Sequence, residues 1–240
     1  MRVFCDLHIH SCLSPCADDD MTPYAIAGMA KLKGLDVVAL TDHNSCANAE
    51  VFLSACAYYG IVGVAGMELT TMEDIHAVCL FPTWERAAEW EKTVREHRVL
   101  VKNRPEIFGR QLIIGPDDEP CGEEAYLLIN ATSLSLQEAA ALVRGLGGAF
   151  YPAHIDREAN GILAILGALP QTPAFPTVEL HDGEAYGNKR VVRASDAHTL
   201  GDILEYGHGI DLVAGRGDAQ GVREALIAAL EGPVPRREGT

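Results

Sequence analysis

Two histidines two positions apart, His8 and His10, follow the apolar run Val3–Cys5 near the start of the chain. In a β-strand this spacing directs both imidazole rings to one face, where they can bind one metal ion together. A His-x-His pair alone is a weak signal, because two histidines that end a strand in hydrogen bonds show the same pattern. The rest of the chain favours the metal site over that alternative.

Four further apolar runs also end in residues that can bind metals. These residues are Asp42 and His43, Glu68, His154, and Asp196 with His198. His76 stands at the start of another apolar run. A carboxylate at the end of a buried strand is unfavourable unless it is paired or binds a cation. Because side chains that follow barrel strands meet at one rim, we expect a common site at the carboxyl ends of these strands.

The types of these side chains indicate the metal and the reaction. Imidazole nitrogens mixed with carboxylate oxygens suit zinc, manganese and iron better than magnesium or calcium. The candidates exceed what one ion binds, which predicts a cluster of two to three divalent ions with a bridging carboxylate. Such a cluster hydrolyses a phosphate ester without a protein nucleophile. We therefore expect Ser11, Ser45 and Ser195, which neighbour candidate ligands, to act as hydrogen-bond partners.

The segments that must position these residues predict an α/β fold. Thr22 and Pro23 mark the start of a helix that ends at Gly34, and Ser135 with Glu138 forms a capping box before another. Further helices are expected over residues 47–59, 84–101, 161–169 and 219–230. Strands are expected over residues 36–40, 61–65, 75–81, 149–151, 178–180, 191–194 and 210–214. The alternation at the start of the chain predicts parallel strands joined by right-handed helical crossovers.

The periodic pattern weakens between residues 102 and 128, where Gly115–Pro120 predicts a loop or the end of a hairpin. One interpretation is an insertion that covers the site as a substrate-choosing flap, and the other is a solvated connector. With no internal repeat, we expect a single domain over residues 1–232 that includes this segment. Residues 233–240 are expected to form a flexible tail.

Bulk composition narrows the class of protein. The 240 residues are 48% hydrophobic, and their formal net charge of −15 opposes stable binding to nucleic acid. The acidic surface remains compatible with a small phosphorylated substrate bound through cations. Without a membrane span or signal peptide, we expect a cytoplasmic protein. Seven cysteines indicate reduced thiols. The alternative, half of a structural zinc site at Cys12 and Cys16, has no second cysteine pair to complete it.

Taken in order, five short segments resemble the PHP (polymerase and histidinol phosphatase) superfamily over nearly the whole chain. The segments are Asp6-Leu7-His8-Ile9-His10, Thr41-Asp42-His43, Gly66-Met67-Glu68 with Ile75-His76, Pro152-Ala153-His154-Ile155-Asp156-Arg157, and Ser195-Asp196-Ala197-His198. The resemblance implies a distorted (β/α)7 TIM-like barrel with a trinuclear metal site. It implies one ion on His8, His10, Glu68 and Asp196, a second on Glu68, His76 and His154, and a third on His43 and His198.

The loop after His10 departs from the pattern of the superfamily, many members of which place a further ligand for the third ion there. Counting backward from Thr22 favours Asp18, whereas counting forward from His10 reaches Pro15 or Cys16. We expect Asp18 to be this ligand, because a hard carboxylate fits the imidazole partners of the third ion.

The resemblance implies a stand-alone metal-dependent phosphoesterase, in which a metal-bound hydroxide attacks the phosphate of a small metabolite or nucleotide. Arg157 is the expected phosphate clamp, and the alternative for it is an ion pair with Asp156 or Glu158. Asp42 is expected either to bind metal or to orient His43 and shuttle a proton. Lys189 and Arg190 are weaker phosphate-binding candidates.

Three other functions remain open at the level of sequence. An exonuclease or oligoribonuclease acting on short strands would use the same metals, but it would need a basic track. A metallohydrolase acting on substrates other than phosphate esters is the second alternative. The third is a non-catalytic metal-binding module, against which the near-complete ligand set argues. The sequence leaves the oligomeric state open.

Overall fold

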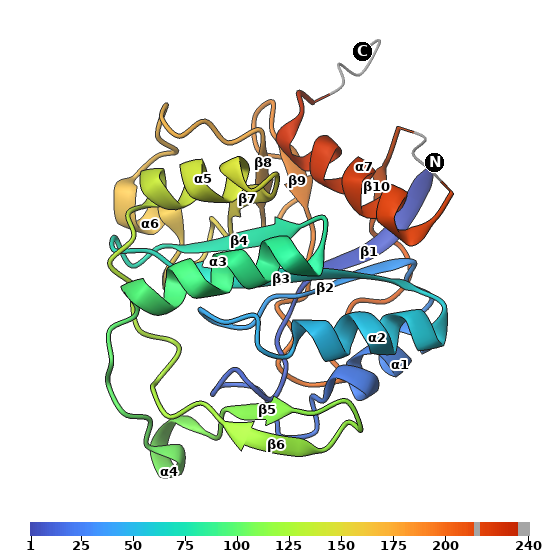
Figure 1. Cartoon of the computed structure of the whole chain (residues 1–240). Coiled ribbons are helices and arrows are strands. Elements are labelled where there is room, and N and C mark those ends of the chain that lie inside the picture. Colours follow the sequence, from blue (N-terminus) through green and yellow to red (C-terminus); the bar gives the residue numbers. More distant parts are fainter. Residues whose placement is uncertain (214–216, 235–240) are drawn as a thin grey trace.

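The computed structural model describes residues 1–213 and 217–234 and has the expected α/β architecture (Figure 1). Its strands are β1 (Arg2–Ile9), β2 (Val37–Leu40), β3 (Val62–Thr70), β4 (His76–Phe81), β5 (Leu112–Ile114), β6 (Pro120–Glu123), β7 (Ala149–Pro152), β8 (Thr177–Glu179), β9 (Arg190–Val192) and β10 (Gly209–Asp211). Its helices are α1 (Pro23–Leu32), α2 (Ala49–Tyr59), α3 (Trp84–His97), α4 (Pro105–Phe108), α5 (Leu136–Gly145), α6 (Ile162–Leu166) and α7 (Ala219–Glu231).

A six-stranded sheet in the order β10-β1-β2-β3-β4-β7 forms the frame of the molecule. Strands β1, β2 and β3 run parallel, which confirms the crossovers predicted from the alternating pattern. Strand β4 is antiparallel to both β3 and β7, so the barrel departs from a purely parallel arrangement. The physical reason is the connection between β3 and β4, which is too short for a helical crossover and allows only a hairpin.

A second, two-stranded sheet of β8 and β9 lies beside β7 and extends the curled sheet from β7 toward β1. After β7, the amide of Ile155 donates to the carbonyl of Glu179 at 2.9 Å. After β9, Ala197 forms a parallel bridge with Ile9, and the amide of His10 donates to the Ala197 carbonyl at 2.9 Å. These bonds bring the ends of β1, β7, β8 and β9 together, as a distorted TIM-like barrel requires.

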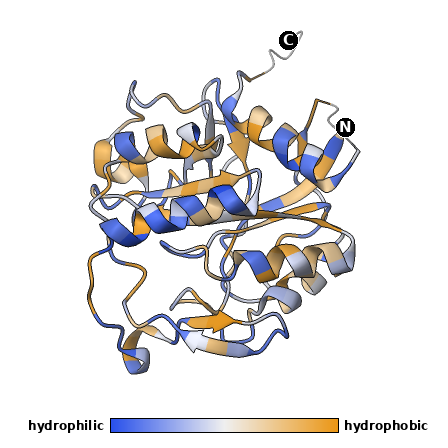
Figure 2. Ribbon diagram, in the orientation of Figure 1, coloured by the Kyte–Doolittle hydropathy of each residue, from blue (hydrophilic) through white to orange (hydrophobic). Residues whose placement is uncertain are grey.

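Helices cover the outside of the curled sheet and close one end of it. Helix α3 lies across β3 and β4, and Figure 2 shows hydrophilic residues along its outer side with hydrophobic strands behind it. Helix α7 packs Leu226 and Leu230 against Val3 and Val78. Its Arg223 donates to the carbonyl of Gly63 near the start of β3, at 2.8 Å. The amino end of the sheet is thus closed, which leaves the carboxyl end for the site.

Capping residues in the sequence predicted most helix starts correctly. Thr22 caps α1 with Pro23 at its first position, and Ser135 and Glu138 form the predicted capping box of α5. Helix α3 is shorter than expected, since it ends at His97 instead of near residue 101. The next residues leave the helix to join the following segment, where the Leu127 amide donates to the Val101 carbonyl at 2.8 Å.

Residues 102–128 fold into α4 and the β5–β6 hairpin, at the lower edge of Figure 1. The amide of Leu112 donates to the Cys12 carbonyl at 2.8 Å. Asn48 donates to the Leu112 carbonyl at 3.0 Å and accepts from the amide of Ile114 at 2.9 Å. The segment is therefore bonded to the loops that follow β1 and β2.

At the end of the chain, β10 ends at Asp211 and pairs antiparallel with β1, so Leu212 and Val213 do not extend the strand as expected. Residue 214 of the expected strand and most of the expected tail, residues 235–240, lie outside the described residues. Within residues 1–213 and 217–234, no helix combines the length and the apolar character needed to cross a membrane.

Candidate metal centre

One rim of the curled sheet brings together eight of the nine metal ligands expected from the sequence. The rim consists of the carboxyl ends of the parallel strands and the start of the antiparallel β4, where His76 lies. Their donor atoms form three groups, each with its atoms within 4.8 Å of one another. We call these the four-residue group (His8, His10, Glu68 and Asp196), the three-histidine group (His10, His43 and His198) and the Glu68–His76 group (His43, Glu68 and His76). The eighth residue, His154, contacts Glu68 directly.

Glu68 lies at the centre of the cluster, on the long strand β3. Its Oε1 is 2.8 Å from Nδ1 of His76, 3.1 Å from Nε2 of His154 and 3.3 Å from Nε2 of His8. Its Oε2 is 3.0 Å from Nδ1 of His43. Because its two oxygens face different histidines, Glu68 has the geometry of a carboxylate that bridges two ions.

The donor atoms fit metal ions better than they fit one another. The Nε2 atoms of His8 and His10 lie 3.1 Å apart, so two imidazole nitrogens with the same hydrogen-bonding properties face each other. Within the described part of the chain, Nδ1 of His43 and Oδ1 of Asp196 are buried and form no aligned hydrogen bond, although each has a polar neighbour 3.0 Å away. A divalent cation would satisfy such converging lone pairs.

Opposite charges dominate the electrostatics of the four-residue group. Burial alone would raise the pKa of the Glu68 carboxyl, but the charges of His76 and His8 hold it well below its usual value. Against the same effect of burial, the neighbouring rings of His8 and His10 hold the pKa of Asp196 low. Burial lowers the pKa of His10, yet the two carboxylates raise it to about 9. This group therefore exchanges protons when it binds a cation.

In the three-histidine group, the pKa values of His43 and His198 are lowered. Burial, helped by the charge of His10, lowers the pKa of His43 to about 3, against the attraction of Glu68. Burial and His10 also lower the pKa of His198 to about 4. Neutral imidazole is the form that binds metals, so both side chains are ready to bind at neutral pH.

Glu179, at the end of β8, is a functional residue that the sequence analysis missed. Its Oε1 lies 3.0 Å from Nδ1 of His8 and accepts a hydrogen bond from the amide of His154 at 3.1 Å. A carboxylate behind a histidine fixes the ring and directs its other nitrogen toward the metal. The signal available in the sequence was a charged residue inside the apolar run Val178–Leu180.

Asp42 is buried but belongs to none of the three metal-binding groups. It accepts from the amide and hydroxyl of Ser11 and from the hydroxyl of Ser14, each at 2.7 Å. Ser14 Oγ lies 2.9 Å from Nδ1 of His10 and accepts from the amide of His43 at 3.1 Å. Asp42 thus acts on His10 through Ser14, instead of contacting the ring of His43 as one of the expected roles required.

The serines next to the ligands bond to carboxylates beside the cluster. Ser195 Oγ donates to Asp6 at 2.6 Å, and Ser45 Oγ donates to Glu91 at 3.2 Å. Asp6 also accepts from the amides of Ser195 and Leu204 at 3.0 Å and 2.9 Å. These bonds anchor the loops that carry the ligands.

The structure does not bring Asp18 into the cluster. Its side chain is exposed, and only its backbone amide reaches the site, donating to the His198 carbonyl at 3.0 Å. Among the described residues, Cys16 also belongs to none of the three groups. The position expected for Asp18 in the third group is taken by His10, which the four-residue group shares.

Arg157 lies at the solvent side of the cluster. Its Nη1 donates to Oδ2 of Asp196, and its Nη2 is 3.2 Å from Nδ1 of His181. The ion pair is therefore with a candidate ligand and not with Asp156 or Glu158, the alternative considered from the sequence. Arg190, the weaker candidate, donates instead to the carbonyl of Ala229 in α7.

Three residues at the site have left-handed backbones that are uncommon outside glycine. They are Asn44 (φ 47°), His154 (φ 26°) and Asp196 (φ 51°). Each lies in a loop just after a strand, where the neighbouring hydrogen bonds hold it. Such conformations persist where the surrounding structure fixes them, and they concentrate at functional sites.

Solved structures support the fold. The structure is similar to that of a lesion-specific endonuclease, PfuEndoQ from Pyrococcus furiosus, with a TM-score of 0.66 and 20% identity over 97% of this chain. It is also similar to endonuclease Q in complex with a 27-mer duplex that has an abasic lesion at the active site, with a TM-score of 0.64 and 18% identity over 98% of this chain. The chain spans only 57% and 58% of the length of those two chains.

A search of curated proteins found no match to the sequence. The sequence profile of the PHP domain, however, matches residues 6–134, which is more than half of the chain. The match includes five of the clustered side chains, and the others follow it in the chain. Together with the curled sheet and the metal-binding groups at its carboxyl end, this match shows that the chain belongs to the PHP domain family.

Proposed function

We propose that the chain is a metal-dependent hydrolase of phosphate ester bonds and that its clustered side chains hold two to three divalent ions. The observation that carries this proposal is the position of Glu68, a buried carboxylate surrounded by imidazoles on both of its oxygens. Zinc, manganese and iron match a donor set of this kind.

Different residues of the chain would bind the ions and orient the ligands. Glu68 joins the four-residue group to the Glu68–His76 group, with His154 beside it. His43 and His198 complete the three-histidine group. When bound, the ions supply Lewis-acid polarisation of the phosphate and lower the pKa of water. Glu179 and Ser14 keep His8 and His10 in their orientations.

The substrate would approach from the side of Arg157. The side chains of His76, His198 and Arg157 are 12%, 28% and 34% exposed, whereas that of His8 is fully buried. The forked guanidinium of Arg157 matches two phosphate oxygens, and its contact with Asp196 holds it beside the cluster. Arg157 therefore binds the phosphate group of the substrate at the solvent side.

We propose a small phosphorylated metabolite or nucleotide as the substrate, with removal of a terminal phosphate. The net charge of −15 supports a small substrate over long nucleic acid. A nuclease is the second candidate, favoured by the similarity to endonuclease Q, one structure of which holds duplex DNA. That similarity concerns the fold, and the substrate must be decided by experiment.

Hydrolysis of a substrate panel tests the proposal directly. Purified protein loaded with Mn²⁺, Zn²⁺ or Fe²⁺ is assayed against phosphomonoesters, dinucleotides, short oligonucleotides and a duplex with an abasic site. We expect phosphate release from a monoester that stops on addition of a chelator. Cleavage of the duplex with no monoester turnover would favour the nuclease. A metal-loaded protein that hydrolyses no member of the panel would contradict the proposed function.

A further inference from the structure

Arg98 is the first residue after α3, and its side chain is only 7% exposed although it carries a charge. Its guanidinium donates in three directions. Nε donates to the carbonyl of Asn44 at 3.0 Å, Nη1 to Oε2 of Glu124 at 3.0 Å, and Nη2 to Oε1 of Glu91 at 2.9 Å. One side chain thus joins the loop after β2, the 102–128 segment and helix α3.

The first of these partners, Asn44, directly follows the candidate ligand His43. The amide of Asn44 donates to the Glu68 carbonyl at 2.9 Å, and its side chain donates to the Leu128 carbonyl at 2.6 Å. Its Oδ1 accepts from the amide of Thr70 at 2.9 Å. With its carbonyl bonded to Arg98, Asn44 has a partner for every polar group, and these bonds hold its left-handed backbone. The position of His43 depends on this conformation.

The second partner, Glu91, holds the same loop two residues further on. Its carboxylate accepts from the amide of Cys46 and from the hydroxyl of Ser45. Arg95 and Arg98 both donate to Oε1 of Glu91, at 2.7 Å and 2.9 Å. Arg95 is 52% exposed, and its side chain donates to Glu91. The two arginines therefore share one partner, while Arg98 also contacts the backbone next to His43.

The third partner, Glu124, follows β6 in the 102–128 segment. The buried Gln111 fixes this part of the segment by donating to the carbonyls of Glu124 and Tyr126 at 2.8 Å and 2.9 Å. The pair of Arg98 and Glu124 is almost fully removed from water, with side chains 7% and 12% exposed. Charge-assisted bonds of this kind are strong and directional. Through Arg98, the segment is thus bonded to the loop that carries His43.

We propose that Arg98 is a positioning residue that holds His43 for metal binding and makes this binding depend on the 102–128 segment. The proposal rests on the metal cluster described above and not on the identity of the substrate. The side-chain partners of Arg98 are Asn44, Glu91 and Glu124 and include no metal-binding donor atom, so Arg98 acts through the backbone of Asn44. Without it, the Asn44 carbonyl, Glu91 and Glu124 would each lose a buried partner.

Cobalt binding by Arg98→Met and Arg95→Met tests this proposal. Both substitutions remove one ion pair with Glu91, but only the first frees Asn44 and Glu124. We expect Arg98→Met to bind one Co²⁺ per chain 10–100-fold more weakly than the unaltered protein, with a changed visible absorption spectrum of the remaining cobalt. Arg95→Met should keep the affinity, the stoichiometry and the spectrum. All proteins are compared well below their unfolding temperatures, so that a loss of stability alone changes neither readout.

Equal cobalt affinity and spectra for folded Arg98→Met and the unaltered protein would overturn the proposal. If Arg98→Met does not fold, Glu124→Gln provides the decision, because it weakens the same connection while leaving Arg98 in place. A weaker ion in Glu124→Gln supports the proposal, and unchanged binding overturns it. Phosphate ester hydrolysis by the unaltered protein is measured separately. A protein that binds cobalt but hydrolyses nothing contradicts the proposed function and leaves the test of Arg98 valid.

Discussion

The four-residue group and the three-histidine group share His10 but are built in different ways. The four-residue group contains two carboxylates, and Glu179 holds its His8 from behind. The three-histidine group contains none. Its His198 has Nδ1 2.7 Å from the backbone carbonyl of Asp196, and within the described chain Nδ1 of His43 has no hydrogen-bond partner. Both carboxylates belong to the first group, and imidazoles alone form the second.

This difference predicts an order of metal binding. Two carboxylates attract a divalent cation strongly in a buried site, whereas the three-histidine group offers only imidazole nitrogens and no negative charge. We therefore expect the four-residue group to bind first and most tightly. The three-histidine group, in which His43 depends on the loop held by Asn44, should bind last.

Glu68→Gln should have the largest effect, because Glu68 belongs to two of the three groups. The amide removes the negative charge and one of the two oxygens that face the histidines. We expect phosphate ester hydrolysis to fall by at least about 1,000-fold, roughly 4 kcal/mol of transition-state stabilisation. Elemental analysis should show the loss of at least one metal ion per chain.

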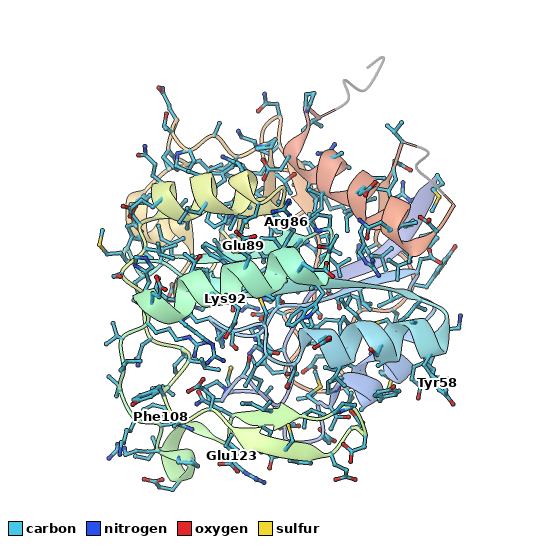
Figure 3. All side chains as sticks on the ribbon, in the orientation of Figure 1. Tyr58, Arg86, Glu89, Lys92, Phe108 and Glu123 are labelled. Carbon is cyan, nitrogen blue, oxygen red and sulfur yellow. The ribbon has the colours of Figure 1, made fainter. Side chains whose placement is uncertain are left out.

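The control for this change is Glu89→Gln on the exposed side of α3, where Figure 3 labels the side chain. It makes the same chemical change far from the cluster, so metal content and activity should remain unchanged. Full metal content in Glu68→Gln would show that Glu68 does not bridge the groups.

Glu179→Gln should weaken the four-residue group selectively. The carboxylate lies 3.0 Å and 3.1 Å from Nδ1 of His8, and its loss reduces the basicity and the fixed orientation of that ring. We expect the tightest metal ion to bind 10–100-fold more weakly, as measured by competition with a chelator. The exposed Glu184→Gln serves as the control. If only the weakest ion were lost, the expected order of binding would be wrong.

The sequence predicted the parts of the site that depend on strand ends. Parallel strands β1 to β3 place their carboxyl ends together, so His8, His10, His43 and Glu68 could be expected at one site from their positions after apolar runs. The four-residue group is the same set that the superfamily resemblance implied. Helix caps at Thr22 and Ser135 were predictable because they depend on neighbours three residues away.

Features that depend on contacts between distant segments could not be predicted. Asp18 was chosen by counting along a loop, but the fold of that loop exposes its side chain and brings His10 to the third group. The role of Glu179 follows from a bond to His8, 171 positions away. The end of α3 at His97 likewise reflects the partners of Arg98, which lie in other elements. Local patterns carry no information on such pairings.

Arg157→Lys should have a smaller effect than either carboxylate change, since it alters substrate binding and leaves the donor atoms intact. The ammonium of lysine keeps the charge but not the planar fork that matches phosphate oxygens. We expect KM to rise about tenfold, near 1.4 kcal/mol, with unchanged metal content. Arg193→Lys is the control, because Arg193 donates to the Gly183 carbonyl away from the cluster. A fall in kcat with unchanged KM would contradict the role of phosphate clamp.

A change of pH should distinguish the four-residue group from the three-histidine group without any substitution. The carboxylates raise the pKa of His10 to about 9, and Glu179 with the same carboxylates raises the pKa of His8 well above its usual value, so both rings hold a proton at pH 7 in the metal-free protein. Binding the first ion must release these protons, and for each proton released its affinity should rise up to about tenfold per pH unit between pH 7 and 9. The pKa values of His43 and His198, about 3 and 4, predict no release when a later ion binds them. Calorimetry in two buffers of different ionisation enthalpy measures the protons released by each ion.

The same shift gives the metal-free protein a dependence of stability on pH. A histidine whose pKa is raised on folding stabilises the folded state fully below its unfolded value, near 6.5, and this contribution is lost as the pH rises to about 9. His43 and His198 act in the other direction, because their lowered pKa values remove stability as the pH falls from about 6.5 toward 3. The metal-free protein should therefore be most stable near pH 6.5, as measured by thermal unfolding with chelator present. The pKa of His8 is raised in the same way, so the double substitution His8→Gln and His10→Gln should remove the loss on the alkaline side, and a loss that persists in this variant would assign it to another group.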